Sequence, residues 1–125
     1  MSNKSKNLIN SLKNAFIGFI SAFRSEKNLR IHLFATIAVI CFGLLCKITI
    51  NEWIAVIIII ALVIISELFN TAVELSVDCF SPEENQEARK IKDISASAVL
   101  IATISSVVVG ILIFGSKVLV FLGLD

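Results

Sequence analysis

A run of 23 residues without a charged side chain, residues 94–116, limits the folds open to this chain more than any other feature. A helix of that length extends about 35 Å, enough to cross a hydrocarbon core of about 30 Å. Of the 125 residues, 57% are hydrophobic, whereas soluble domains have about 45–50%. Because so short a chain has no large interior in which to bury the excess, we expect an integral membrane protein.

Two further apolar runs, residues 31–46 and 53–66, are short of the about 20 residues that a helical span needs. The second has 14 residues, so it must continue through Glu67, Asn70 and Glu74 to cross the membrane. We therefore predict three transmembrane helices, at about residues 29–50, 52–78 and 93–119.

The first 28 residues have a different pattern, with apolar side chains at helical spacing and polar ones at most other positions. The apolar side chains belong to Leu8, Ile9, Leu12, Phe16, Phe19, Ile20 and Phe23. This pattern is typical of an amphipathic helix that lies in the membrane surface. The expected fold of residues 1–125 is thus one all-α integral membrane domain, with a surface helix at residues 1–28 and three spans.

Basic residues predict the orientation in the plasma membrane. Six precede the first span and three lie between the second and the third, whereas the opposite side has only Lys47 and Lys117. The positive-inside rule then places the N-terminus and residues 79–92 in the cytoplasm and the C-terminus outside. A net charge of +1 gives no indication of a nucleic-acid partner.

Four polar residues, Glu67, Asn70, Glu74 and Asp78, directly follow the shortest apolar run. At 100° per residue, their side chains fall within about 80° of each other on one helix face. A solvated helix end would account equally well for Asp78. It does not account for Glu67, about 16 Å deeper, because ionisable groups in a membrane are costly and usually functional.

The sequence SPEE, which begins at Ser81, has the pattern of a helix start, with Ser81 as the cap and Pro82 in the first turn. We therefore predict that the third transmembrane helix begins near Pro82. With the hairpin folded at Ser81, Lys92 would reach a depth between those of Glu74 and Glu67. One cation and several carboxylates would then meet near the cytoplasmic membrane surface.

Carboxylates beside a lysine suit magnesium and phosphate together. Mg²⁺ is held by about one or two carboxylates plus substrate phosphates, and phosphoryl transfer also needs a base for the hydroxyl group. Neither a P-loop nor a glycine-rich kinase loop occurs in the sequence. Glu26, between the surface helix and the first span, could join this group or could simply pair with Arg30 one turn later.

The motif SELFNTAVELSVD at residues 66–78, followed by ARKIKDISASAVLIA at 88–102, resembles the small prokaryotic diacylglycerol kinase family. The upstream stretch GFISAFRSEKNLRIHL at 18–33 resembles the Gram-positive branch, whose usual substrate is undecaprenol. The resemblance covers nearly the whole chain.

The resemblance implies ATP-dependent phosphorylation of a membrane lipid hydroxyl with Mg²⁺ as cofactor, in homotrimers that build their sites between subunits. It implies that Glu67 is the catalytic base and that Glu26 and Glu74 are metal ligands. The residues that it implies for nucleotide binding are Asn70, Asp78, Glu83, Asn85, Lys92 and Asp93. Those that it implies for lipid binding are Arg30, Glu67 and Ser97.

Undecaprenol is the favoured acceptor, since Ala96 stands where the diacylglycerol branch has a serine. The nearest alternative keeps the chemistry and changes the acceptor to diacylglycerol, which would give phosphatidic acid. A small cation-coupled transporter is a more remote alternative, although such transporters usually have four spans. A purely structural membrane subunit would leave the polar face of the second span unexplained.

Overall fold

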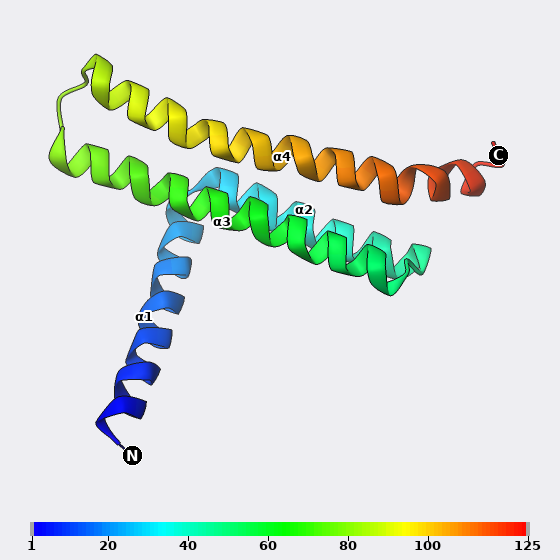
Figure 1. Ribbon diagram of the computed structural model, residues 1–125, viewed down its shortest axis with the longest axis horizontal. Helices are drawn as coiled ribbons and strands as arrows, with labels where there is room; N and C mark the ends of the chain where they lie inside the picture. Colours follow the sequence, from blue (N-terminus) through cyan, green and yellow to red (C-terminus); the bar gives the residue numbers. More distant parts are fainter. Residues whose placement is uncertain (1, 125) are drawn as a thin grey trace.

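The computed structural model describes residues 2–124, which form four helices and, within that range, no strand. These are α1 (Asn3–Ser25), α2 (Lys27–Cys46), α3 (Ile50–Phe80) and α4 (Gln86–Phe121). Helices α2, α3 and α4 lie side by side and alternate in direction, whereas α1 leaves the bundle at a steep angle (Figure 1). We call the bundle end with the α3–α4 loop the loop end, and the end with the α2–α3 turn the turn end.

Three of the four helices, α2, α3 and α4, are long and apolar enough to cross a membrane, which confirms the expected number of spans. Their outer surfaces are largely aliphatic and aromatic, with exposed side chains such as Phe34, Ile57 and Leu112. A helix satisfies its own backbone groups, so such a surface can face lipid at no hydrogen-bonding cost. The structure is therefore that of a multi-pass membrane protein.

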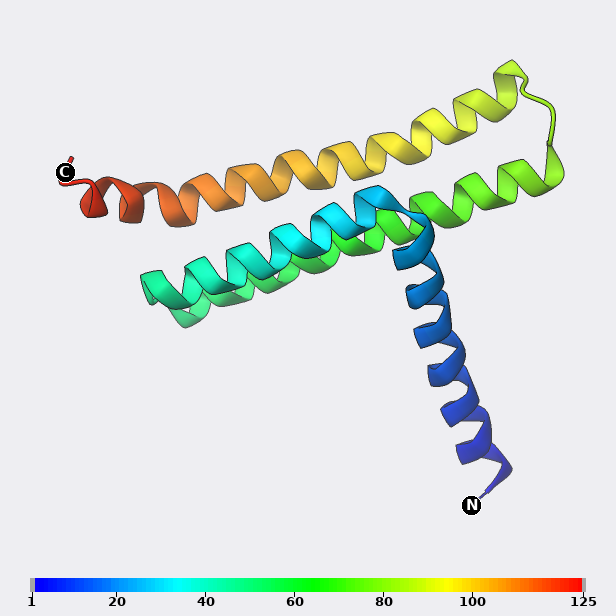
Figure 2. The same cartoon turned by 180° about the vertical axis from the view of Figure 1, so that it is seen from behind.

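Helix α3 lies at the centre of the bundle, because α4 packs along it and α2 packs on another side (Figure 2). The buried apolar core near the turn end consists of Ile48, Val56 and Ile113, with partly buried neighbours around it. Only a few side chains are buried within one chain, and Leu29 near the start of α2 is the largest of those that are fully buried.

The turn end is fixed by local hydrogen bonds and one ion pair. Lys47 ends α2 in the left-handed conformation at φ 51°. Thr49 and Glu52 then begin α3 with a reciprocal capping box, in which Thr49 Oγ1 accepts from the Glu52 amide at 3.2 Å. Lys117 Nζ lies 3.0 Å from Glu52 Oε1 and so ties α4 to the same end of α3.

The loop end differs from the expectation. Helix α4 begins at Gln86, four residues after Pro82, and its cap is Asn85, whose Oδ1 accepts from the Ala88 amide at 2.8 Å. The prediction of a start near Pro82 was therefore wrong. Ser81 instead ends α3, and its hydroxyl group donates to the Glu83 carbonyl at 3.3 Å, so it does not cap α4.

Helices α2 and α3 approach closely where Gly43 faces Trp53. A Cβ atom at Gly43 would lie 2.8 Å from Trp53 Cη2 and 3.2 Å from Ile48 Cδ1. Both distances are too short for a relaxed contact, so this position requires glycine for packing. A matched glycine, Gly18 in α1, has no such neighbour within 4 Å.

We predict that Gly43→Ala destabilises the protein by about 1–3 kcal/mol, the usual cost of overpacking a core. Gly18→Ala is the control, because alanine is otherwise favoured in a helix by about 0.5–1 kcal/mol. Thermal unfolding of both variants in one detergent measures the difference. A Gly43→Ala protein as stable as the Gly18→Ala protein would contradict this reading of the α2–α3 contact.

Candidate active site

Glu67 is the deepest polar side chain of the predicted site. It lies on α3 and has an exposed fraction of 3%. On the neighbouring helix α2, His32 faces this carboxylate, with Nε2 at 3.2 Å from Glu67 Oε1. One turn later, the Thr71 hydroxyl group donates to the Glu67 carbonyl at 2.9 Å, so the buried backbone there is also paired.

Asn70 and Glu74 follow on the same face of α3, as helical spacing predicts. Asn70 Nδ2 lies 3.4 Å from Glu74 Oε1 and donates to it. The charge of Glu74 acts on the Glu67 carboxyl. Asn70 Oδ1 is buried, and within residues 2–124 it has no hydrogen-bond partner.

Glu26 is the single residue between α1 and α2. Its backbone is extended, its amide donates to the Ala22 carbonyl at 2.8 Å, and its side chain does not cap α2. The carboxylate is close enough for its charge to act on Glu67. The charges of Glu26, at the α1–α2 junction, and of Glu74 on α3 both act on Glu67, and we call these three residues the carboxylate cluster.

Arg30 does not neutralise Glu26. Its Nη1 atom donates instead to the carbonyl groups of Phe23 at 2.8 Å and Arg24 at 2.9 Å, at the end of α1. Among the described residues, Glu26 and Arg30 do not form an ion pair with each other. Arg30 therefore holds the α1–α2 junction together, and its contact with lipid stays a prediction.

Lys92 pairs with Asp78 across the α3–α4 hairpin, with Nζ at 2.6 Å from Oδ1. The sequence placed Lys92 deeper, between Glu74 and Glu67. The structure pairs it with Asp78 instead, nearer the loop end, because α4 begins only at Gln86. The charge of Glu74 also acts on the Lys92 ammonium group.

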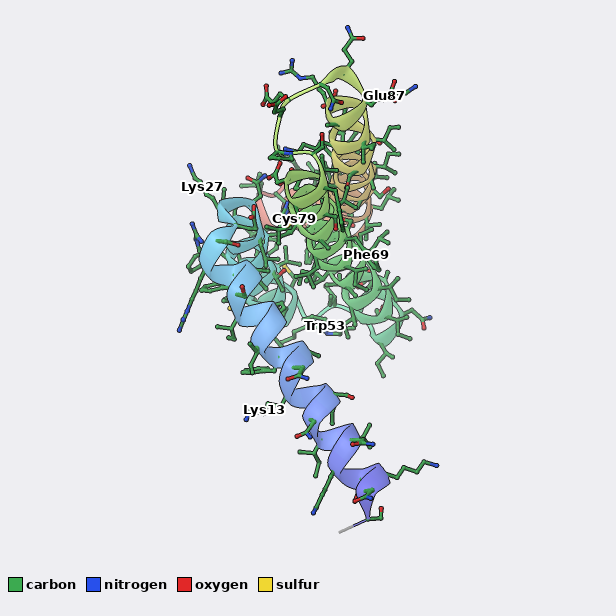
Figure 3. The ribbon with its side chains drawn as sticks, turned by 90° about the vertical axis from the view of Figure 1, so that its left-hand side faces the viewer. Lys13, Lys27, Trp53, Phe69, Cys79 and Glu87 are labelled. Carbon is green, nitrogen blue, oxygen red and sulfur yellow. The ribbon has the colours of Figure 1, made fainter. Side chains whose placement is uncertain are left out.

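A polar recess of about 560 Å³ surrounds this ion pair at the loop end. Its lining includes four residues that the resemblance implied for nucleotide binding: Asp78, Asn85, Lys92 and Asp93. Figure 3 looks at this end and shows nitrogen and oxygen atoms gathered around the loop between Cys79 and Glu87. The recess has the volume of an ordinary ligand pocket, about 300–1,000 Å³.

The other predicted residues lie elsewhere. Asn70 lies on the same face of α3 as Glu67 and Glu74. The Glu83 side chain is exposed in the α3–α4 loop. Ser97 is exposed on α4, where its hydroxyl group donates to the Ile94 carbonyl at 2.6 Å. Asp93 and Ser97 share a shallow surface depression along α4, whose lining does not include Glu67.

Sequence reasoning missed His32 as a partner of Glu67. The available signal was that the only histidine of the chain lies in an otherwise apolar span. An isolated polar group in such a span needs a partner, since an unpaired one is costly in lipid. Which partner it finds depends on the rotation of α2 against α3, and the sequence does not give that rotation.

The donor atoms of the site are of the kind that Mg²⁺ prefers. Glu26 and Glu74 offer carboxylate oxygens, and the unpaired Asn70 Oδ1 is a further neutral oxygen on the same face. Within residues 2–124, no group of three or more metal-binding side chains is present. A pair of carboxylates matches a Mg²⁺ ion whose remaining ligands are phosphates and water.

Residues 13–114 match the family model described as prokaryotic diacylglycerol kinase. This chain belongs to that family. It is therefore a lipid kinase, and membership in a kinase family decides against the transporter and structural alternatives. ATP and a lipid alcohol are the substrates that this family implies.

Three relatives cover most of the chain. An undecaprenol kinase from Bacillus subtilis (strain 168) is 33% identical over 120 residues, which cover 90% of this chain and 98% of the relative. A diacylglycerol kinase from Synechocystis sp. is 42% identical over 108 residues, which cover 83% of this chain and 60% of the relative. A diacylglycerol kinase from Pseudomonas aeruginosa is 29% identical over 97 residues.

Proposed function

We propose that this protein uses ATP to phosphorylate the hydroxyl group of undecaprenol at the cytoplasmic surface of the plasma membrane. The observation that carries the proposal is a buried glutamate, Glu67, placed where a long apolar helix meets two further carboxylates. The undecaprenol kinase from Bacillus subtilis, which matches this chain over nearly its whole length, supports the choice of lipid.

Glu67 acts as the general base. The hydroxyl oxygen of the lipid attacks the γ-phosphorus of ATP, the bond from that phosphorus to the ADP oxygen breaks, and the hydroxyl proton passes to Glu67. ADP leaves, and the proton is then released to water. For this role, a Glu67 oxygen must come within about 2.6–3.2 Å of the hydroxyl oxygen of the lipid.

Glu26 and Glu74 hold the magnesium ion. The charges of Glu26 and Glu74 act on the Glu67 carboxyl, so the three carboxylates repel one another. A bound cation relieves this repulsion. When bound, Mg²⁺ neutralises phosphate charge and orients the transferred group. Asn70, hydrogen-bonded to Glu74, keeps that carboxylate in place and belongs to the nucleotide side of the site.

The polar recess at the loop end binds the nucleotide. Lys92 supplies the cation for the phosphates. Until ATP binds, its pairing with Asp78 keeps the ammonium group at the recess. Asp93, Asn85 and the adjacent Glu83 complete the set of proposed contacts. The recess faces the cytoplasm in the proposed topology, so ATP reaches it from water while the lipid arrives through the bilayer.

Helix α1 is the surface helix of the proposed topology, and α2, α3 and α4 are the spans. The steep angle of α1 to the bundle suits a helix that lies along the membrane, and the exposed Leu12 and Phe16 of α1 suit contact with lipid. The N-terminus and residues 79–92 are then cytoplasmic and the C-terminus is outside. The proposed spans, about 29–50, 52–78 and 93–119, belong to a single domain.

The active unit is a homotrimer whose sites are shared between subunits. Few side chains are buried within one chain, so its helices keep faces that can pack against other subunits. Ser97 is exposed on α4 and Arg30 bonds to the end of α1, and a neighbouring subunit can bring further lipid contacts to Glu67. Diacylglycerol is the second candidate acceptor, supported by the Synechocystis relative that carries that name.

We predict that Glu67→Gln lowers the phosphorylation rate by about 10²–10⁴-fold, the usual loss on removing a general base. The amide keeps the size of the side chain but cannot take the hydroxyl proton. Glu87→Gln, at an exposed position in the first turn of α4, is the matched control. Rates with labelled ATP and undecaprenol check this, and a Glu67→Gln enzyme with more than half the normal rate would refute the assignment.

Glu74→Gln should raise the Mg²⁺ concentration needed for half-maximal rate, because the metal loses a charged oxygen ligand. A magnesium titration at saturating ATP measures the change, and Glu26→Gln should act in the same direction. The exposed Glu87→Gln again serves as control. An unchanged magnesium requirement in both variants would remove the two carboxylates from the metal site.

Undecaprenol should give a higher rate than diacylglycerol when the two are compared in one bilayer at equal mole fraction. The hydroxyl group of a polyprenol lies at the headgroup boundary, because its tail is wholly apolar and stays in the hydrocarbon. Both lipids can reach Glu67, so the rate ratio reports lipid choice alone. A faster reaction with diacylglycerol would assign the protein to the second candidate, with base and metal ligands unchanged.

A further inference from the structure

The contact between His32 and Glu67 joins two helices at the centre of the site, and the motif on α3 does not include it. We propose that His32 is a positioning residue, which holds one oxygen of the Glu67 carboxylate so that the other oxygen faces the lipid hydroxyl group. The inference rests on the proposed function, in which Glu67 is the base.

The geometry leaves a defined task for each carboxylate oxygen. His32 Nε2 lies 3.2 Å from Oε1, and a hydrogen bond donated across this contact leaves Oε2 to accept a proton. A free glutamate side chain has several rotamers, and fixing it in one of them costs conformational entropy. A hydrogen bond that is already formed in the resting protein meets this cost before the substrate arrives.

The surroundings of Glu67 make this contact hard to replace. The other groups whose charges act on it are the carboxylates of Glu26 and Glu74, which repel it. Among the described residues, His32 is thus the side chain that acts on the carboxylate with a favourable hydrogen bond. With Glu67 almost fully buried, that bond forms where the local dielectric is low, and it is correspondingly strong.

The surroundings of the imidazole ring are mostly apolar. The ring lines a narrow cavity of about 130 Å³ between α2, α3 and α4, whose walls are mostly aliphatic, including Val39, Val56 and Val63. The exposed fraction of the His32 side chain is 20%. Apolar walls offer few alternative partners for the ring nitrogen, so its hydrogen bond to Glu67 is the favoured state.

Substitutions at His32 separate positioning from packing. Glutamine can place an amide N–H group near the former Nε2 atom, whereas asparagine is shorter and places its amide near the former Nδ1 atom. Leucine fills similar space and donates nothing. If His32 positions Glu67, glutamine should preserve the function and both asparagine and leucine should lose it.

The test compares wild type, His32→Gln, His32→Asn, His32→Leu and Glu67→Gln as full-length protein in bilayers with undecaprenol and ATP. We expect His32→Leu and His32→Asn to lower kcat by about 10–100-fold, the scale of a misplaced catalytic group. His32→Gln should stay within about threefold of wild type, and the KM for ATP should change little in all three. Adding His32→Leu to Glu67→Gln should cause no further loss, because the two groups act as one unit.

The outcomes separate this inference from the proposed function. Full activity of His32→Leu, with Glu67→Gln inactive, would overturn the positioning role and leave the base assignment intact. Lack of lipid phosphorylation by the wild type, or full activity of Glu67→Gln, would overturn the proposed function itself.

Thermal unfolding of each variant supplies the second readout. A purely structural role predicts that kcat follows stability, so equal rates for His32→Gln and His32→Asn at equal stability would also overturn the inference. Those two variants both keep a polar side chain, so their comparison decides the question even if His32→Leu does not fold.

Discussion

A carboxyl group buried between membrane helices is the constraint on which the rest of this structure depends. Removing a carboxylate from water costs several kcal/mol even after the protein relaxes around it. Glu67 offsets part of that cost through His32 on α2 and lies beside two further carboxylates that raise it again. Such an arrangement has little structural benefit, and it is the arrangement that a proton-accepting group and a cation would need.

The two ends of the bundle are built differently around this constraint. At the turn end, the Gly43–Trp53 contact and the Glu52–Lys117 ion pair lock α2 and α4 onto α3. At the loop end, the pairing of Asp78 with Lys92 is the corresponding link, and a polar recess surrounds it. Close packing is thus concentrated at the turn end, and polar groups are concentrated at the loop end, where we propose that the nucleotide binds.

The features that depend on one helix alone were predictable from the sequence. The 3.6-residue period placed Glu67, Asn70 and Glu74 on one face, and apolar length gave the three long helices. The start of α4 was not predictable in the same way, because Ser81 and Asn85 are both good caps and the competition between them is decided by the fold of the loop.

Contacts between helices were the part that the sequence could not supply. The pairing of Lys92 with Asp78 follows from where α4 begins, and that of His32 with Glu67 follows from how α2 is rotated against α3. Helical spacing relates side chains within one helix and gives no information about the rotation of one helix against another. Glu26 reaches the cluster for a similar reason, through the direction in which α1 leaves the bundle.

That junction has a mechanical consequence. Only Glu26 separates α1 from α2, and Arg30 fastens the last carbonyl groups of α1 to the first turns of α2. The joint is therefore short and stiff, and a tilt of α1 displaces the Glu26 carboxylate relative to Glu67. In the proposed topology α1 rests on the cytoplasmic leaflet, and the curvature and packing of that leaflet would then alter the spacing of the carboxylates, which would make the bilayer a mechanical input to the site as well as its solvent.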